Sequence, residues 1–536
     1  MPEYLSPGVY VEEVASGPRP IEGVSTSNAG FVGRSERGPT RPRLVTSWGD
    51  FVRWYGGTID ANRSFLPYAV RGFFENGGQR LFVARVAGAG ATPANDQIAT
   101  AAADLMVVTA SGPGDWGDNL MLRIRLATQN SAAPQNWFRI TVLYYRDGIP
   151  NPFVDPTDPA QLANPDRREP DVLEDYDNLT VQTGRSNFVD SVVNSSSRLI
   201  QIAWDDGGGN PGTPTRPNDQ AFAALANGGA DGNETVVDYA GNAALPEDRR
   251  TGLAGLEVID EISLLAAPDE VNGAIANANQ ITTGLVDQCE RLRDRFALLN
   301  VALGQGGQIQ NIQVPRDSTY GAVYFPWIRV FDNRLQQDAL VPPAGHVAGV
   351  YARTDVDRGV HKAPANEVLR GLYFADPNGP RQPLEVRITK QEHDILNPRG
   401  VNVIRDFRAD GRGIRVWGAR TMSSDPLWRY VNVRRLFLFL EESIDEGTQW
   451  VVFEPNDEPT WAGVRRAVTN FLIRVWRSGA LQGATQDEAF FVRCDRTTMT
   501  QDDIDNGRLI CLIGVAPVKP AEFVIFRISQ KTVEAE

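Results

Sequence analysis

Three histidines are the residues of this sequence best suited to acid–base or nucleophilic chemistry: His346, His361 and His393. A serine hydrolase needs a histidine base beside a serine nucleophile, and an acidic residue that orients the imidazole. None of the three histidines is followed by the glycine-rich serine turn of such enzymes. The spacing of His346 and His361 also fails the pattern of two metal ligands on one helix face. We therefore expect all three histidines to be structural or surface residues.

Paired carboxylates are the other common source of acid–base catalysis. Asp355 with Asp357, and Glu441 with Glu442, form such pairs, but acidic pairs are also common on solvated surfaces. A glycosidase would in addition need a cleft lined by aromatic residues, which a sequence does not reveal. The acidic loop at 155–175 lacks the spacing of an EF-hand calcium site. The sequence thus predicts no catalytic residue, no cofactor and no metal site.

Cysteine usage and charge exclude further classes of protein. Cys289, Cys494 and Cys511 are odd in number and far apart, which favours neither a disulfide framework nor a zinc site. The net charge of −14 argues against a nucleic-acid partner, because such proteins normally carry a basic surface. No apolar run approaches the roughly 20 residues that a membrane-spanning helix requires. The first residues lack the basic-then-apolar pattern of a signal peptide, so we expect synthesis and folding in the cytoplasm.

The 536 residues are too many for one ordinary core, so several domains are expected. Between residues 401 and 461 the pattern predicts a compact α+β module. Val401–Phe407 and Ile414–Met422 read as strands, a helix is expected to begin at Asp425-Pro426, and Thr448–Glu454 reads as a further strand. A second helix is predicted from about Pro459 to a stop at Gly479.

The middle of the chain changes character twice. From 87 to 231 the sequence is rich in Gly, Pro, Asn, Asp and Ser, with alternating apolar residues in two runs, which indicates a β-rich insertion. From 232 to 366, apolar strands alternate with a helical segment. This alternation is typical of a partly parallel sheet with helical crossovers.

Each end of the chain carries one isolated strand pattern. Val9–Val14 lies among turn-forming residues, and Ala521–Ile528 follows Pro517 and Pro520. A strand this isolated needs the edge of a sheet elsewhere. That edge can belong to its own subunit or, by strand addition, to a neighbouring one. The residues expected to pair are Val9, Tyr10, Val11, Val14, Phe523, Val524, Ile525, Phe526 and Ile528.

Several stretches of this chain resemble the contractile tail sheath proteins of myophages and of phage-tail-like injection systems. They are SPGVYVEEV at 6–14, LPYAVRGFFENGGQRLFVARV at 66–86, VPPAGHVAGVYARTDVDRGVHKAPANEVLRG at 341–371, WGARTMSSDPLWRYVNVRRL at 417–436 and VFEPNDEPTW at 452–461. The resemblance is strongest in residues 1–86 and 320–536 and weakest between them.

The resemblance implies a multi-domain α/β and α+β fold. It would consist of a subtilisin-like α/β domain with a β-sandwich-like insertion, a C-terminal α+β core domain, and extended N- and C-terminal strand arms. The implied domains are an N-terminal arm at 1–23, the subtilisin-like domain at 24–86 and 232–366, the insertion at 87–231, the core domain at 367–516 and a C-terminal arm at 517–536.

The resemblance also implies function. Sheath subunits form six-fold rings that stack helically around an inner tube protein, contact baseplate and terminator proteins, and contract to drive the tube through a target envelope. Such particles assemble in the bacterial cytoplasm, without nucleic acid as a partner and without direct membrane insertion. We expect a bipolar charged surface at intersubunit or tube-facing contacts, with ordinary solvated helix charges as the alternative. Its residues are Arg429, Arg434, Arg435, Glu441, Glu442, Asp445 and Glu446.

Two other functions remain open from the sequence. One is a non-contractile binding module, such as a baseplate or adhesin component. The other is an α/β hydrolase whose catalytic histidine is lost or hidden. Because superfolds often carry unrelated functions, the implied subtilisin-like fold does not by itself predict activity, and we expect no enzyme.

Overall fold

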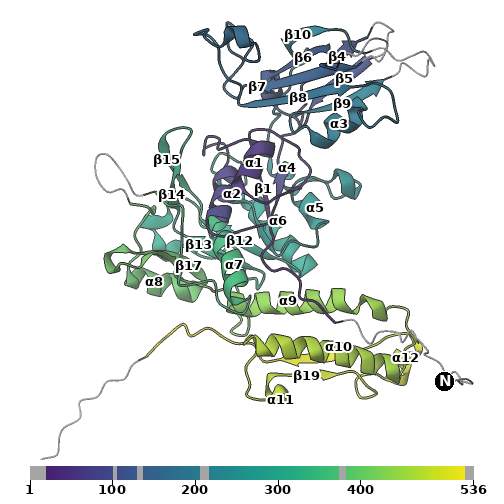
Figure 1. Ribbon diagram of the computed structural model, residues 1–536. Coiled ribbons are helices and arrows are strands. Elements are labelled where there is room, and N and C mark those ends of the chain that lie inside the picture. The colour runs from purple at the N-terminus through teal and green to yellow at the C-terminus, as the bar shows by residue number, and fades with distance from the viewer. Residues whose placement is uncertain (1–19, 101–104, 130–136, 206–215, 374–381, 526–536) are drawn as a thin grey trace, which may run out of the picture. The chain divides into compact units, whose positions relative to one another are not determined.

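The computed structural model describes residues 20–100, 105–129, 137–205, 216–373 and 382–525 (Figure 1). The chain divides into two compact units. Unit 2 is Ser27–Arg353 with Pro364–Arg429. Unit 1 contains Thr354–Ala363 and the described parts of Met1–Thr26 and Tyr430–Glu536.

Unit 2 is built on a nine-stranded sheet in the order β16-β18-β17-β13-β12-β11-β1-β3-β2. The six strands from β17 to β3 are mutually parallel, and β2, β18 and β16 add antiparallel edges. The bounds are β1 (Ala29–Gly33), β2 (Arg43–Val45), β3 (Leu81–Arg85), β11 (Leu264–Ala266), β12 (Phe296–Asn300), β13 (Gly321–Phe325), β16 (Glu367–Val368), β17 (Val401–Phe407) and β18 (Gly413–Val416).

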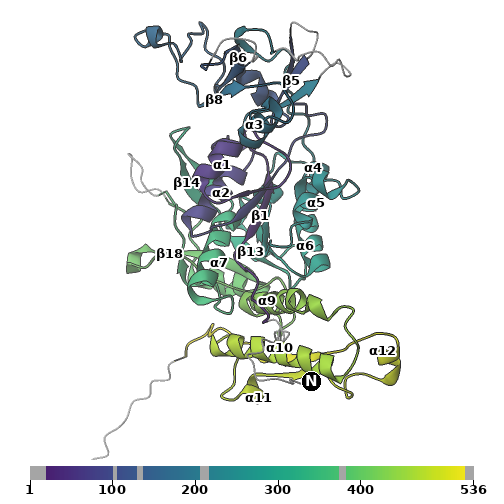
Figure 2. The same cartoon turned by 45° about the vertical axis from the view of Figure 1, so that its right-hand side comes forward.

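Helices cover both faces of this sheet, which explains why its central strands are apolar at nearly every position. Figure 2 shows α4, α5 and α6 on one side and α1, α2 and α7 on the other. The helices are α1 (Trp48–Tyr55), α2 (Leu66–Glu75), α4 (Val236–Ala240), α5 (Gly252–Glu257), α6 (Asn279–Leu292), α7 (Ala344–Arg358) and α8 (Lys390–Leu396). An antiparallel hairpin, β14 (Ile328–Asp332) and β15 (Gln337–Val341), precedes α7.

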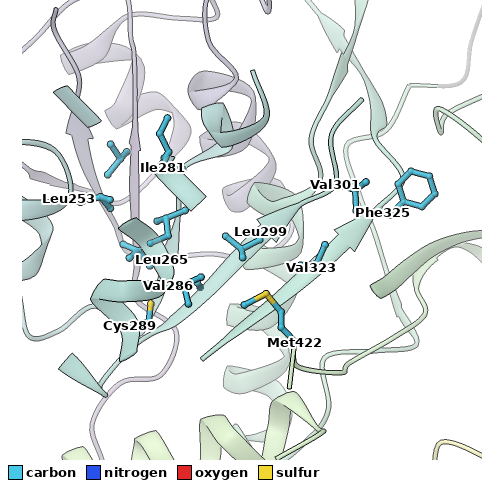
Figure 3. Packing of buried hydrophobic residues seen from close by; sticks show 14 of the residues in the cluster. Leu253, Leu265, Ile281, Val286, Cys289, Leu299, Val301, Val323, Phe325 and Met422 are labelled. Atoms are coloured by element: carbon cyan, nitrogen blue, oxygen red, sulfur yellow. The ribbon is translucent and has the colours of Figure 1, made fainter. Parts of the chain in front are cut away.

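One apolar core lies between the sheet and the helices α5 and α6. Leu265, Leu299 and Val323 from neighbouring parallel strands belong to one buried cluster with Ile281 and Val286 of α6 (Figure 3). All five side chains are buried. Because each Å² of apolar surface removed from water contributes about 25 cal/mol, the burial of these side chains stabilises the packing of the sheet against the helices.

The segment between β3 and α4 forms two antiparallel sheets that share a second core. One has the order β10-β6-β7-β8 and the other β4-β5-β9, with α3 (Val189–Ser196) beside them. The alternating runs of the sequence lie in β6 and β7. The bounds are β4 (Asn95–Ala99), β5 (Leu105–Ala110), β6 (Leu120–Leu126), β7 (Phe138–Tyr144), β8 (Val172–Leu179), β9 (Ile200–Asp205) and β10 (Gln220–Ala224).

Unit 1 is organised by two long helices, α9 (Val431–Thr448) and α10 (Glu458–Arg477). The Asp457 side chain accepts a hydrogen bond from the Thr460 amide and so caps α10, and Pro459 lies in its first turn. The helix ends before Gly479, which has a positive φ of 85°. The smaller elements are α11 (Gln486–Ala489), β19 (Phe490–Arg493), α12 (Gln501–Asp505) and β20 (Leu512–Val515).

The predicted helix exists as α9, but its predicted start and the strand predicted after it were wrong. The Asp425 carboxylate accepts from the Leu427 amide and closes a local turn, so the helix begins only at Val431. The predicted strand Thr448–Glu454 is instead the end of α9, a 3₁₀ turn at Gln449–Val451 and an exposed bend. Its β-forming residues have no strand to pair with among the described residues, and context overrides their propensity.

The C-terminal half divides at a different place from the one the sequence predicts. Strand β17 pairs in parallel with β13, so residues 401–407 are part of the large sheet of unit 2. The helical module of unit 1 begins at Tyr430, whereas the predicted core domain began at residue 367. The pattern of a strand identifies its type but not which sheet it joins.

Candidate functional site

The buried histidine of unit 2 is a packing residue. His346 lies in α7, and a Cβ added to Gly72 would approach its Nδ1 to 2.2 Å, so the ring occupies space that only a glycine leaves free. Burial, with a smaller contribution from Arg71, lowers the pKa of His346 to about 3. The imidazole is therefore neutral at physiological pH and shielded from solvent.

His361 lines a pocket of about 770 Å³ in unit 1, together with Asp355 and Ser478. These residue types would suit a hydrolase, but Ser478 and Asp355 form their hydrogen bonds with residues other than His361. The Ser478 hydroxyl donates to the Val475 carbonyl at 2.7 Å, and the Asp355 carboxylate accepts from Arg435. Among the described residues, His361 thus has neither an activated serine nor an orienting carboxylate. Its pKa is lowered, mainly by burial.

His393 lies half-buried in α8. Within the described residues, no group of three or more His, Cys, Asp or Glu side chains is arranged to hold a metal ion. None of the described helices combines the length and apolar character that crossing a membrane requires.

Sequence reasoning missed two carboxylates that the fold buries just after β11. Asp269 accepts from the Ser64 hydroxyl and the Phe65 amide, both at 2.6 Å. Glu270 accepts from the Asn300 amide at 2.7 Å, at the end of β12. Burial raises the pKa of both, to about 8 for Glu270. The signal in the sequence was an acidic pair directly after a buried apolar run.

This position, at the carboxyl ends of parallel strands, is where open α/β sheets commonly bind ligands. Here the two carboxylates accept hydrogen bonds from neighbouring loops. Tyr239 donates to Asp269 at 3.0 Å, and Asn300, which is held by Glu270, accepts in turn from the Ala344 amide at the start of α7. The arrangement fixes loops to one another through buried hydrogen bonds.

Arg435 lies inside unit 1, with Asp355 as its partner. The two side chains are only 3% and 2% exposed, and they share two hydrogen bonds of 3.0 and 2.5 Å. Thr26 adds a hydroxyl donor to the Asp355 carboxylate and a carbonyl acceptor for Arg435, both at 2.8 Å. The cluster joins three segments that are distant in sequence. Arg435 is thus a structural residue of its own subunit.

The remaining charges of the predicted surface have different environments. Arg434 is buried, while Arg429 is half-exposed in unit 2. In the second half of α9 the carboxylates of Glu441, Asp445 and Glu446 are exposed, and Glu442 is half-buried. The exposed part of the predicted surface is therefore acidic, because the arginines of α9 face inward.

Unit 1 also contains a small two-stranded sheet, which packs against α10. Strand β19 pairs only with β20 among the described residues, in the antiparallel register Phe490↔Val515 to Arg493↔Leu512. Phe491, Leu512 and Ile513 of these strands are exposed. A two-stranded sheet with apolar side chains in solvent is a typical site for pairing with another strand.

After β20, residues 518 and 522 are held by hydrogen bonds, whereas residues 523–525 are exposed. Asn432 of α9 donates to the Val518 carbonyl at 3.1 Å, and Tyr430 donates to Glu522 at 3.1 Å. Beyond this point Phe523, Val524 and Ile525 are 71%, 70% and 77% exposed and form no strand. The other predicted arm residues, Val9, Tyr10, Val11, Val14, Phe526 and Ile528, lie outside the described residues.

Comparison with known proteins identifies the family of this chain. Residues 248–422 match the phage tail sheath protein central domain, and residues 423–531 match the phage tail sheath C-terminal domain. The chain belongs to the contractile tail sheath family. The junction of the two matched domains lies close to Tyr430, where unit 1 resumes. The insertion with its two small sheets lies outside both matches.

The similarity to curated members of the sheath family covers only part of this chain and part of each relative. The tail sheath protein of Vibrio phage KVP40 is 25% identical over 42% of this chain and 32% of its own length. That of Burkholderia phage BcepMu is 28% identical over 34% of this chain and 38% of its own length. The chain thus spans about a third of the length of these relatives.

Solved sheath structures match along nearly the whole chain. The helical sheath of the anti-feeding prophage in its contracted state is 25% identical, covers 98% of this chain and 99% of its own, and has a TM-score of 0.57. A contracted sheath complex of an extracellular contractile injection system, at 22% identity and a TM-score of 0.54, shares the fold. The mixed α/β architecture with several sheets is therefore that of sheath proteins.

Proposed function

We propose that this chain is the subunit of a contractile sheath, which polymerises helically around an inner tube and shortens to drive the tube through a target envelope. The observation that carries the proposal is the end-to-end match with the contracted helical sheath of the anti-feeding prophage, at 25% identity. The proposed assembly is built of six-fold rings. It contacts an inner tube protein, baseplate proteins and a terminator or cap protein.

The proposed architecture assigns a part to each segment. The proposed subtilisin-like domain (24–86 and 232–366) contains most of the parallel sheet and the helices on its two faces, and the two small sheets form its insertion (87–231). The proposed core domain (367–516) contributes β17 to this sheet and contains α9 and α10, and the proposed strand arms are at 1–23 and 517–536. Five of the six parallel strands, covered on both faces, support the first assignment.

The proposed link between subunits is strand addition. The exposed Phe523, Val524 and Ile525 begin a segment with apolar residues on both faces, which suits a strand covered on both sides. The two-stranded sheet of β19 and β20 offers exposed apolar residues, and its two strands pair with no third strand among the described residues. Backbone pairing between copies would keep the lattice connected while the subunits rotate.

We further propose that the protein is not an enzyme and that its particle assembles in the bacterial cytoplasm. Beside His361, the Ser478 hydroxyl donates to the Val475 carbonyl and the Asp355 carboxylate accepts from Arg435, which supports the first statement. The exposed acidic end of α9, with Glu441, Asp445 and Glu446, is the proposed charged contact with a neighbouring subunit or the tube.

Negative-stain electron microscopy of the full-length protein beside a version lacking residues 521–536 tests this function. We expect helical tubes from the full-length protein and none from the shortened one. A matched control is Asp487→Asn in α11, an exposed change that should leave the tubes intact. Tubes from the shortened protein would discard the C-terminal arm but keep the sheath. Single particles throughout, even with the inner tube protein added, would favour a non-contractile binding module.

A further inference from the structure

The fold brings two cysteines together that the sequence separates. Strands β19 and β20 pair so that Arg493 lies opposite Leu512. Continuing this antiparallel register by one residue places Cys494 opposite Cys511. Neither cysteine is in a disulfide.

The hydrogen-bond pattern shows which kind of cross-strand pair this is. The Ala516 amide donates to the Ala489 carbonyl at 2.9 Å, so these two residues, opposite each other in the same register, are a hydrogen-bonded pair. Pairs alternate along an antiparallel ladder, and Cys494 with Cys511 lies five positions further. This is a non-hydrogen-bonded pair, in which opposite Cα atoms are roughly 4.5 Å apart. A disulfide accepts Cα separations of about 4.4–6.8 Å.

Both side chains are on the inner face of the small sheet. Cys494 is fully buried and Cys511 half-buried, and both pack in the apolar core of unit 1. Their thiols interact directly: a hydrogen bond with Cys511 lowers the pKa of Cys494, and the same bond raises that of Cys511. The half-buried position of Cys511 gives a small oxidant a route to the pair.

We propose that Cys494 and Cys511 are a redox modification site that forms an intramolecular disulfide across the end of the β19–β20 hairpin. The oxidant is a low-molecular-weight disulfide such as oxidised glutathione. One thiolate attacks it, forming a mixed disulfide and releasing one glutathione thiolate. The second cysteine, as its thiolate, attacks the protein sulfur of that mixed disulfide and releases the second glutathione. Two protein thiols are oxidised and one glutathione disulfide is reduced, and the two protons that the protein thiols lose pass through water to the two glutathione thiolates released.

The bond would close the loop of residues 495–510 and join the two strands covalently. Such a cross-link lowers the chain entropy of the unfolded state. It would be absent in a reducing medium and would form once the protein reaches an oxidising one. The inference depends only on the hairpin of unit 1, so it stands or falls separately from the sheath function.

The test is a thiol count on the folded full-length protein after incubation with oxidised glutathione and removal of the excess. Maleimide labelling in denaturant, followed by mass spectrometry, should find one free thiol instead of three, with an unlabelled mass lower by about 2 Da for the two hydrogens lost. Peptide mapping should join residues 494 and 511, and dithiothreitol should restore all three thiols.

Two variants keep the proposal falsifiable. Cys511→Ser, at the half-buried position, should abolish the 2 Da loss. Cys289→Ala removes the remaining cysteine, which is buried in unit 2, and should leave the linked pair intact. Three free thiols in the treated wild-type protein, a stable mixed disulfide with glutathione, or a link that involves Cys289 or a second chain would each overturn the inference.

Discussion

Arg435 and Asp355 share two hydrogen bonds in the interior of unit 1, and Thr26 completes the cluster. Two charges removed from water contribute little net stability as a pair, because desolvation offsets their attraction. Removing one partner is different, because the remaining charge stays buried without compensation. At this scale, single side chains hold together segments that the sequence separates widely.

Arg435→Met should therefore destabilise unit 1 by about 3–5 kcal/mol, the usual cost of breaking a buried ion pair. The measurement is urea-induced unfolding of the full-length protein, followed by tryptophan fluorescence. Arg496→Ala is the matched control, since Arg496 and its partner Glu458 are 68% and 70% exposed and should contribute about 0–1 kcal/mol. Equal losses in the two variants would show that the buried pair is not structural.

Glu270→Gln should change how stability depends on pH. The pKa of Glu270 is raised from 4.5 to about 8 in the folded protein, so the folded state holds a proton that the unfolded state releases. Its contribution is fully present below pH 4.5 and is lost as the pH rises toward 8, by about 1.4 kcal/mol per pH unit. Glutamine resembles the protonated acid at every pH. As the pH rises from 4.5 to 8, the free energy of unfolding of the variant should therefore increase relative to that of the wild type by this amount per pH unit.

Unfolding midpoints between pH 4.5 and 8 measure this difference, and Glu458→Gln on an exposed side chain controls for the loss of a carboxylate. A parallel pH profile for wild type and Glu270→Gln would contradict the assigned ionisation. Neither Glu270 nor Asp269 was predicted to matter, because burial of a carboxylate follows from which loops meet at the sheet end. The local sequence pattern does not specify which loops come together there.

Helix α10 is an element that its own sequence specifies. Its cap, its proline and its apolar stripe are local signals, and they agree, so the predicted helix near Pro459 is confirmed. The segment at 448–454 has strand-forming residues but no partner strand among the described residues, and the prediction failed there. Likewise β17 was predicted with its correct bounds, while its place beside β13 depends on a parallel pairing that no short pattern shows.

Asp457→Ala should lower the stability of unit 1 by about 1 kcal/mol, since the side chain satisfies a backbone amide at the start of α10. Asp445→Ala is the control, because this exposed aspartate lies within α9 and alanine favours a helix interior. The readout is the urea midpoint of the full-length protein. A loss at position 445 as large as that at 457 would mean that the cap contributes nothing specific.

At the scale of the whole molecule, the resemblance of long stretches of sequence to sheath proteins predicted the family and the function. The comparisons confirm the family. The division of the chain at Tyr430 was not predictable, because strands and helices adjacent in sequence belong to different units. We propose that assembly depends on surfaces that the described chain leaves exposed, above all Phe523, Val524 and Ile525 and the hairpin of β19 and β20.

Phe523→Asp combined with Ile525→Asp should therefore prevent assembly while the subunit still folds. Both side chains are exposed in the single chain, so the charges cost little there, whereas a covered strand cannot accept them. Sedimentation should show subunits in place of polymer, and circular dichroism should be unchanged. Polymer at wild-type yield would exclude these residues from the contact.

The proposed function requires that a sheath built from this chain has two states, one extended and one contracted. Cryo-electron microscopy can distinguish them in tubes assembled with the inner tube protein, imaged before and after brief heating or exposure to urea. We expect long, narrow tubes that become shorter and wider with the subunits still connected. Tubes of one unchanging length and diameter, or no tubes at all, would contradict the proposed function.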